Sequence, residues 1–138
     1  MSKIYVTRKI PESGPLLLKT AGHELVISEK DGVLTKVELV EALKKDKYDA
    51  VLCLLTDTID AEVFDAAGKG CKIFANYAVG FDNIDLAAAR ERGLVITNTP
   101  GILTETVAEH TFALMLAISH RISEADRFTR SGKYQGWG

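Results

Sequence analysis

The stretch AVLCLLTDT, residues 50–58, begins with six uninterrupted apolar residues and continues directly into polar ones. An apolar run of this length is typical of a strand at the centre of a parallel sheet, because helices then cover both of its faces. Thr56, Asp57 and Thr58 mark the loop at the carboxyl end of the strand. The stretch therefore predicts an α/β fold in which residues 50–55 form a central strand.

Short β-type runs alternate with helical segments on both sides of this stretch, throughout the first 100 residues. We expect strands at residues 3–7, 24–28, 50–55, 72–75 and 94–98, and helices at residues 14–21, 35–45, 60–67 and 86–92. This order favours a parallel sheet with helices on its faces. For residues 1–100 we predict a flavodoxin-like, three-layer α/β domain with a five-stranded parallel sheet. Ligands in such folds bind beyond the carboxyl ends of the strands, here the loops after residues 55, 75 and 98.

Local signals mark the ends of two of these helices. Thr35 and Glu38 have the spacing of a capping box. Asp85 is the expected N-cap of the helix at residues 86–92. The helix at residues 35–45 is expected to bury one apolar face, formed by Val37, Leu39, Val40 and Leu43.

The chain changes character after Pro100 and Gly101, because no glycine or proline follows until Gly132. This pattern predicts one long helix or two in tandem, which we assign to residues 101–131 as an interdomain or dimerisation helix. Thr106 and Glu109 again have capping-box spacing. Residues 111–118 are apolar nearly all round and so are expected to be buried. We expect the earlier helices to cover the sheet already. The surface that buries residues 111–118 would then belong to another domain or another subunit. Residues 132–138 are Gly-rich and show no strand or helix pattern.

Composition and charge exclude several classes of partner. The 138 residues carry 17 basic and 19 acidic side chains, a formal net charge of −2, and 46% are hydrophobic. Nucleic acids and anionic membranes are usually bound by a basic patch, and none is visible. No apolar run approaches the ~20 residues of a membrane span, and residues 1–9 lack the pattern of a secretory signal. We expect a cytoplasmic protein with neither nucleic-acid nor membrane partners.

Nucleotide and metal motifs are missing from the sequence. Gly68-Lys69-Gly70 precedes a strand, whereas a dinucleotide loop follows one, so we interpret it as a turn. His110 and His120 would lie about 15 Å apart along a helix, too far to share a metal ion. We therefore predict no metal site.

Cysteines and clustered acids also have structural interpretations. Cys53 and Cys71 lie in apolar strand-like runs and are expected to be free, buried thiols. The acidic cluster at residues 57–65 is attributed mostly to charges at the start of a helix, where they complement the helix dipole.

The loop YAVGFD, residues 77–82, is the most informative polar segment. Gly80 follows a strand and lets the backbone approach a ligand closely, and successive N–H groups there can form an anion-binding nest. The alternative is a simple strand-to-helix turn in which Phe81 packs inward. The residues alone leave both interpretations open.

Several segments resemble the D-isomer-specific 2-hydroxyacid dehydrogenases in order and spacing: NYAVGFDNID (76–85), RERGL (90–94) and TNTPGILTETVAE (97–109). LCLLTD (52–57) and GKYQGW (132–137) resemble the glyoxylate and hydroxypyruvate reductase branch in particular. The resemblance covers essentially the whole chain. It identifies the chain as an N-terminal substrate domain, also called the catalytic domain, of that family.

The resemblance implies roles for particular residues. The backbone N–H groups of Val79 and Gly80 would bind the substrate carboxylate, and Leu55 would line the substrate pocket. Val107 would pack against the nicotinamide ring, with Thr104 one turn before it, as cofactor-binding positions. The implied activity is hydride transfer between NAD or NADP and a small 2-oxo or 2-hydroxy acid, such as glyoxylate or hydroxypyruvate.

Other parts of the family pattern have no counterpart in these residues. The family's Rossmann domain carries G-x-G-x-x-G and the catalytic Arg, Glu and His, and also the residues that separate NAD from NADP. The resemblance implies that residues 132–138 are the start of the linker to such a domain. We therefore expect no catalytic residue in this chain, no activity of the chain alone, and a homodimer that could form by helix exchange. The alternative is a stand-alone flavodoxin-like binding or regulatory module.

Overall fold

The computed structural model describes residues 1–137, so Gly138, the last position of the expected linker, lies outside the described residues. The chain consists of two compact units, Met1–Pro100 and Gly101–Gly138, and each is described by itself. No helix in the described part is long and apolar enough to cross a membrane.

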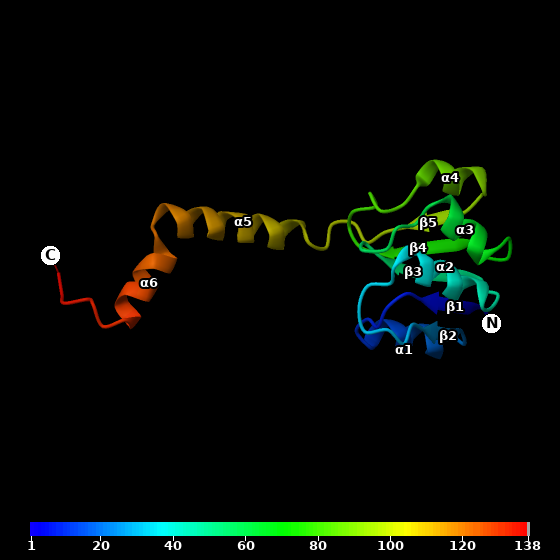
Figure 1. Cartoon of the computed structure of the whole chain (residues 1–138), viewed down its shortest axis with the longest axis horizontal. Helices are drawn as coiled ribbons and strands as arrows, with labels where there is room; N and C mark the ends of the chain where they lie inside the picture. Colours follow the sequence, from blue (N-terminus) through cyan, green and yellow to red (C-terminus); the bar gives the residue numbers. More distant parts are fainter. Residues whose placement is uncertain (138) are drawn as a thin grey trace. The chain divides into compact units, whose positions relative to one another are not determined.

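The first unit is built around a five-stranded parallel sheet with strand order β2-β1-β3-β4-β5 (Figure 1). This is the flavodoxin-like order, and it confirms the expected fold with the apolar stretch at its centre. The strands are β1 (Lys3–Val6), β2 (Glu24–Ile27), β3 (Ala50–Leu54), β4 (Ile73–Tyr77) and β5 (Val95–Thr97). The helices are α1 (Ser13–Thr20), α2 (Lys36–Lys44), α3 (Ala61–Ala67) and α4 (Leu86–Glu91).

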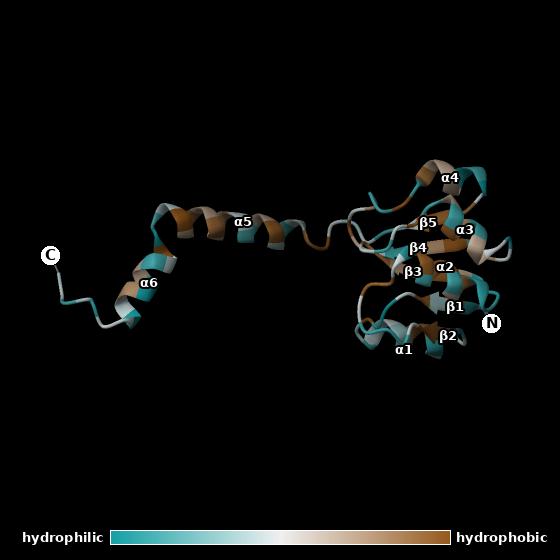
Figure 2. Cartoon of the chain, viewed as in Figure 1, coloured by the Kyte–Doolittle hydropathy of each residue, from teal (hydrophilic) through white to brown (hydrophobic). Residues whose placement is uncertain are grey.

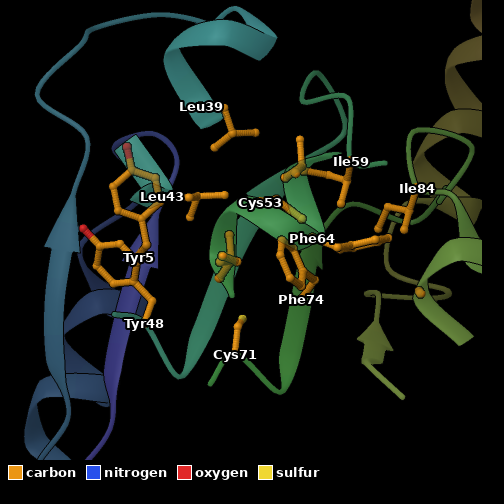
Figure 3. Packing of buried hydrophobic residues seen from close by; sticks show 14 of the residues in the cluster. Tyr5, Leu39, Leu43, Tyr48, Cys53, Ile59, Phe64, Cys71, Phe74 and Ile84 are labelled. Carbon is orange, nitrogen blue, oxygen red and sulfur yellow. The ribbon is translucent and has the colours of Figure 1, made fainter. Parts of the chain in front are cut away.

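One face of the sheet carries the main core (Figure 3). Tyr5, Val51 and Phe74 stand side by side in the strand register and are buried. Residues of α2, α3 and α4 cover them, and Phe64 of α3 meets Phe74 edge to face at a centroid distance of 5.0 Å. Aromatic pairs favour this geometry, which adds to the free energy gained by burying their area. Three helices therefore share this single face.

The opposite face is covered unevenly. Ile4 and Val6 of β1 are buried, and α1 packs near β2. On the other side of the sheet Ile73 is only half-buried and Val95 is 53% exposed. The expectation that the earlier helices cover the whole sheet is therefore wrong at β4 and β5, because three of the four helices pack on the first face.

The local signals at two helix starts are confirmed. Thr35 Oγ1 accepts a hydrogen bond from the Glu38 N–H at 3.3 Å, and Glu38 accepts one from the Thr35 N–H at 2.7 Å. Asp85 caps α4 by accepting from the Ala88 N–H at 2.9 Å. Two orphan donors of α2 and one of α4 are thereby satisfied.

The expected apolar face of α2 needs one correction. Leu39, Val40 and Leu43 are buried, whereas Val37 is 67% exposed. With about 100° of rotation per residue, Val37 points roughly 110° away from the centre of the stripe that the other three form.

The second unit contains two helices in tandem, α5 (Thr104–Ser119) and α6 (Ile122–Arg130) (Figure 2). They meet at Arg121, whose backbone is left-handed with φ of 52°. Taken by itself, this unit buries no residue of either helix, so residues 111–118 still need a partner surface. The expected capping box is wrong, since α5 begins at Thr104 and places Thr106 inside the helix.

The capping box makes the stability of the fold dependent on pH. The hydrogen bond from Lys30, together with those from Thr35, lowers the pKa of Glu38 from 4.5 to about 2. The pKa of Glu38 is lower in the folded state than in the unfolded state. The hydrogen bonds of its carboxylate therefore stabilise the fold fully above pH 4.5, and this stabilisation is lost as the pH falls towards 2. We expect Glu38→Gln to lower the thermal unfolding midpoint at neutral pH. The difference in midpoint between this variant and wild type should shrink as the pH falls from 4.5 towards 2. Glu41→Gln, at an exposed position of the same helix, is the control. A difference in midpoint that stays constant across this interval would contradict the prediction.

Candidate functional site

Three strands end side by side at the carboxyl edge of the sheet. The register pairs Leu54 of β3 with Tyr77 of β4, and Ala75 of β4 with Thr97 of β5. The loops that follow these strands therefore leave from adjacent points. Leu55, Val79 and Gly80, which the sequence singled out, all lie in these loops.

All three asparagines of the chain are at this edge, and each donates its side-chain amide to backbone carbonyls. Asn76, buried at the end of β4, donates to Gly80 O at 2.9 Å. Asn98, directly after β5, donates to Val79 O at 2.8 Å. Asn83 donates to the carbonyl of Leu54, the last residue of β3, at 3.1 Å and to that of Asp57 in the following loop at 3.0 Å. Sequence reasoning assigned no role to these amides.

The loop after β4 has its carbonyls bound by the protein and its N–H groups unpaired. The carbonyl of Ala78 accepts from the Thr99 N–H at 2.9 Å, and the next two carbonyls accept from the asparagine amides. Within residues 1–137, the N–H groups of Val79, Gly80 and Phe81 donate to no protein acceptor. Three consecutive N–H groups on this partly exposed loop are thus free to donate to a ligand.

Phe81 is 47% exposed, so the alternative in which it packs inward is wrong. The loop is instead fixed by hydrogen bonds to its carbonyls, a constraint that leaves the Phe81 ring at the surface.

Asp57 organises the neighbouring loop from inside the protein. It is 4% exposed, and its Oδ2 atom accepts from Thr7 Oγ1 at 2.5 Å and from the Leu54 N–H at 2.8 Å. The interpretation as a helix-start charge is wrong for this residue, because α3 begins later, with Asp60 as its cap. The signal that could have identified it is its place, three residues after a buried strand.

Cys53 lies beneath the same edge as an inert thiol. It is fully buried, and its sulfur is 3.6 Å from the Asn76 side-chain oxygen. Burial, with a smaller contribution from the negative charge of Asp57, raises the pKa of the thiol to about 12. A protonated thiol is a poor nucleophile. The expectation that both cysteines are free and buried is confirmed.

The remaining predicted positions are exposed. Leu55 follows β3 and is 64% exposed, at the edge that carries the free donors. Thr104 and Val107 belong to the other unit, where they lie one turn apart at the start of α5, and Val107 is 58% exposed. Over residues 1–137, no cluster of three or more His, Cys, Asp or Glu is arranged to hold a metal ion.

Residues 4–130 match the profile of a family described as D-isomer specific 2-hydroxyacid dehydrogenase, catalytic domain. The chain belongs to this family. Among its curated relatives is a glyoxylate reductase of Thermofilum pendens, 49% identical over 132 residues. That match covers 96% of this chain and 38% of the relative. The resemblance inferred from the loop motifs is confirmed.

Solved structures agree with this membership. A protein of Thermus thermophilus matches this family member with a TM-score of 0.85 and 39% identity, over 99% of this chain and 42% of that one. An NAD⁺-bound 3-phosphoglycerate dehydrogenase of Entamoeba histolytica matches with a TM-score of 0.69 and 28% identity, over 99% and 42%. The chain thus spans about two fifths of the length of these proteins.

Substitution of Asp57 tests whether its buried carboxylate stabilises the carboxyl edge of the sheet. In Asp57→Ala, the Thr7 hydroxyl and the Leu54 N–H lose their acceptor inside the protein. We expect the free energy of unfolding, measured by urea denaturation, to fall by ~3 kcal/mol. Asp82→Ala, at an exposed position in the adjacent loop, should change it by less than ~0.5 kcal/mol. Equal effects of the two substitutions would refute a specific role for Asp57.

Proposed function

We propose that this chain is the substrate-binding part of an oxidoreductase that transfers a hydride between NAD or NADP and a small 2-oxo or 2-hydroxy acid. The observation that carries the proposal is the row of unpaired N–H groups at Val79, Gly80 and Phe81. Relatives named glyoxylate reductase favour glyoxylate as the acid, and the resemblance of residues 52–57 and 132–137 adds hydroxypyruvate as a second candidate.

The free N–H groups suit a carboxylate. Hydrogen bonds from neutral amides to an ionised oxygen are shorter and roughly twice as strong as those between neutral groups. In the proposed complex, the N–H groups of Val79 and Gly80 hold the two carboxylate oxygens. The exposed Leu55 side chain supplies an apolar wall for the rest of a small substrate.

The cofactor fits this chain only in part. Val107 offers an exposed apolar surface, and Thr104 offers a hydroxyl one turn away, a combination suited to the nicotinamide end. The sequence has no G-x-G-x-x-G loop to hold a pyrophosphate. When bound, NAD or NADP supplies or accepts the hydride, and we assign most of its binding to residues outside this chain.

The described edge also lacks an acid or base suited to the reaction. The three histidines, His23, His110 and His120, lie outside the loops that carry the free donors. The carboxylate of Asp57 is buried and already accepts two hydrogen bonds. We therefore assign the proton donor to groups outside this chain, and we propose that the chain alone is inactive.

A second copy of the chain is the proposed partner of α5. Within residues 111–118 of this helix, five apolar side chains are more than half exposed: Phe112, Leu114, Met115, Leu116 and Ile118. An apolar surface of this kind is costly to leave in water, and a helix on a separate unit can exchange between two copies. We further propose a cytoplasmic location, where free buried cysteines are typical.

Gly80→Ala tests the carboxylate site. An added Cβ meets no atom closer than Asp82 Oδ2 at 3.7 Å, so the protein itself tolerates the change, whereas a ligand held against the glycine would not. We expect ~10-fold weaker binding of oxamate, a carboxylate analogue of 2-oxo acids, followed by NMR titration of the chain. Gly70→Ala, which also has open space and lies before β4, is the matched control. Equal affinity of the two variants would contradict the site.

A direct assay tests the inactivity of the chain. Purified chain is mixed with glyoxylate and NADH or NADPH, and cofactor absorbance is followed over time. We expect no rate above the protein-free control, because the hydride site and the proton donor are incomplete. Oxidation of the cofactor that scales with the amount of chain would overturn this part of the proposal.

Sedimentation across a concentration series tests the partner of α5. We expect the chain to self-associate, and Phe112→Asp to shift it towards monomer, because a charge in an apolar interface is unpaired. Glu105→Gln, in the first turn of the same helix, should leave the association unchanged. A monomer at every concentration would count against the homodimer.

A further inference from the structure

We infer that Asn76 and Asn98 are positioning residues of the carboxylate site, which turn the backbone of residues 79–81 so that its N–H groups face the ligand. The inference rests on the proposed function, and it adds the residues that prepare the site. Neither side chain needs to touch the substrate.

The geometry of the peptide bond carries the argument. In a trans peptide the carbonyl and the following N–H point in opposite directions. Asn98 binds the carbonyl of Val79 at 2.8 Å, so the N–H of Gly80 points away from Asn98. Asn76 binds the carbonyl of Gly80 at 2.9 Å, so the N–H of Phe81 points away from Asn76. Each carboxamide thus fixes the direction of one donor.

The carbonyl of Ala78 is also held by a hydrogen bond. It accepts from the backbone N–H of Thr99 at 2.9 Å, which directs the N–H of Val79 in the same manner. Thr99 is the residue after Asn98, so the loop after β5 holds two of the three carbonyls. Without these bonds, the carbonyls could turn towards the ligand and repel its carboxylate.

Asn76 lies in a strand of the sheet and Asn98 directly follows one, which makes both suitable for positioning. Asn76 is 2% exposed, belongs to β4, and also donates to Asn83 Oδ1 at 3.1 Å. Asn98 is half-buried and directly follows β5. Groups mounted on strands hold a site more rigidly than groups on free loops.

Asn98→Ala is the sharper test, because Asn98 is half-buried and makes a single side-chain bond to the loop. The full 138-residue chain is used, and residual dipolar couplings report the direction of each backbone N–H. We expect the coupling of Gly80 to change in Asn98→Ala as its N–H reorients. Couplings within β1, β3 and β4, and the thermal unfolding midpoint, should be nearly unchanged. Thr97→Ala, an exposed neighbour on β5, is the control and should leave the Gly80 coupling as in wild type.

Oxamate titration is the second readout. We expect Asn98→Ala to bind oxamate ~5-fold more weakly than wild type, the effect of one lost hydrogen bond. An unchanged Gly80 coupling in this variant would overturn the inference, even if wild type binds oxamate through Val79 and Gly80. If wild type shows no oxamate-dependent shift at these amides while the coupling still changes, the proposed carboxylate site fails and the positioning of the backbone stands.

Discussion

The side-chain amide of Asn83 links two loops on which the whole edge of the sheet depends. Its nitrogen donates to the carbonyls of Leu54 and Asp57 after β3, while its backbone carbonyl accepts from the Ile59 N–H at 2.9 Å. Its side-chain oxygen meets the Asn76 amide at 3.1 Å. These hydrogen bonds of Asn83 therefore tie the loop after β3 to the loop after β4. This is possible only because β3 and β4 are parallel neighbours that end in register.

A carboxylate site built from backbone amides has a particular advantage for a small substrate. Lysine or arginine would bring long side chains with rotamer freedom to lose, whereas backbone N–H groups are already in place. The cost is that their carbonyls must be held elsewhere, since a buried or crowded unpaired carbonyl is unfavourable. Asparagine is suited to this task because it donates hydrogen bonds without adding charge beside an anion.

Sequence reasoning succeeded where the signal is local and periodic. The apolar run at residues 50–55, the alternation of strands and helices, and the Thr35 and Asp85 caps all depend on neighbouring residues, and the structure has them. The motif around Gly80 also identified the family before any fold was known.

The incorrect predictions concern residues whose surroundings depend on contacts with segments far away in the sequence. Asp57 looked like a helix charge, but Thr7, fifty residues away, draws it into the interior. The residues alone also did not decide whether Phe81 packs inward, because the loop is fixed by amides from other segments. The coverage of the sheet was overestimated because a sequence does not say on which face each helix packs. The roles of the asparagines were missed for the same reason, although their placement at the ends of strands was a visible clue.

The donors at residues 79–81 and the carboxamides behind them share one property: none of them ionises in the range where proteins are stable. In the proposed site, the hydrogen bonds to a carboxylate would therefore come from groups that do not themselves titrate, as long as the acid stays ionised. An enzyme with a carboxylate site of this kind can change the pKa values of its catalytic acid and base without losing these hydrogen bonds to the substrate.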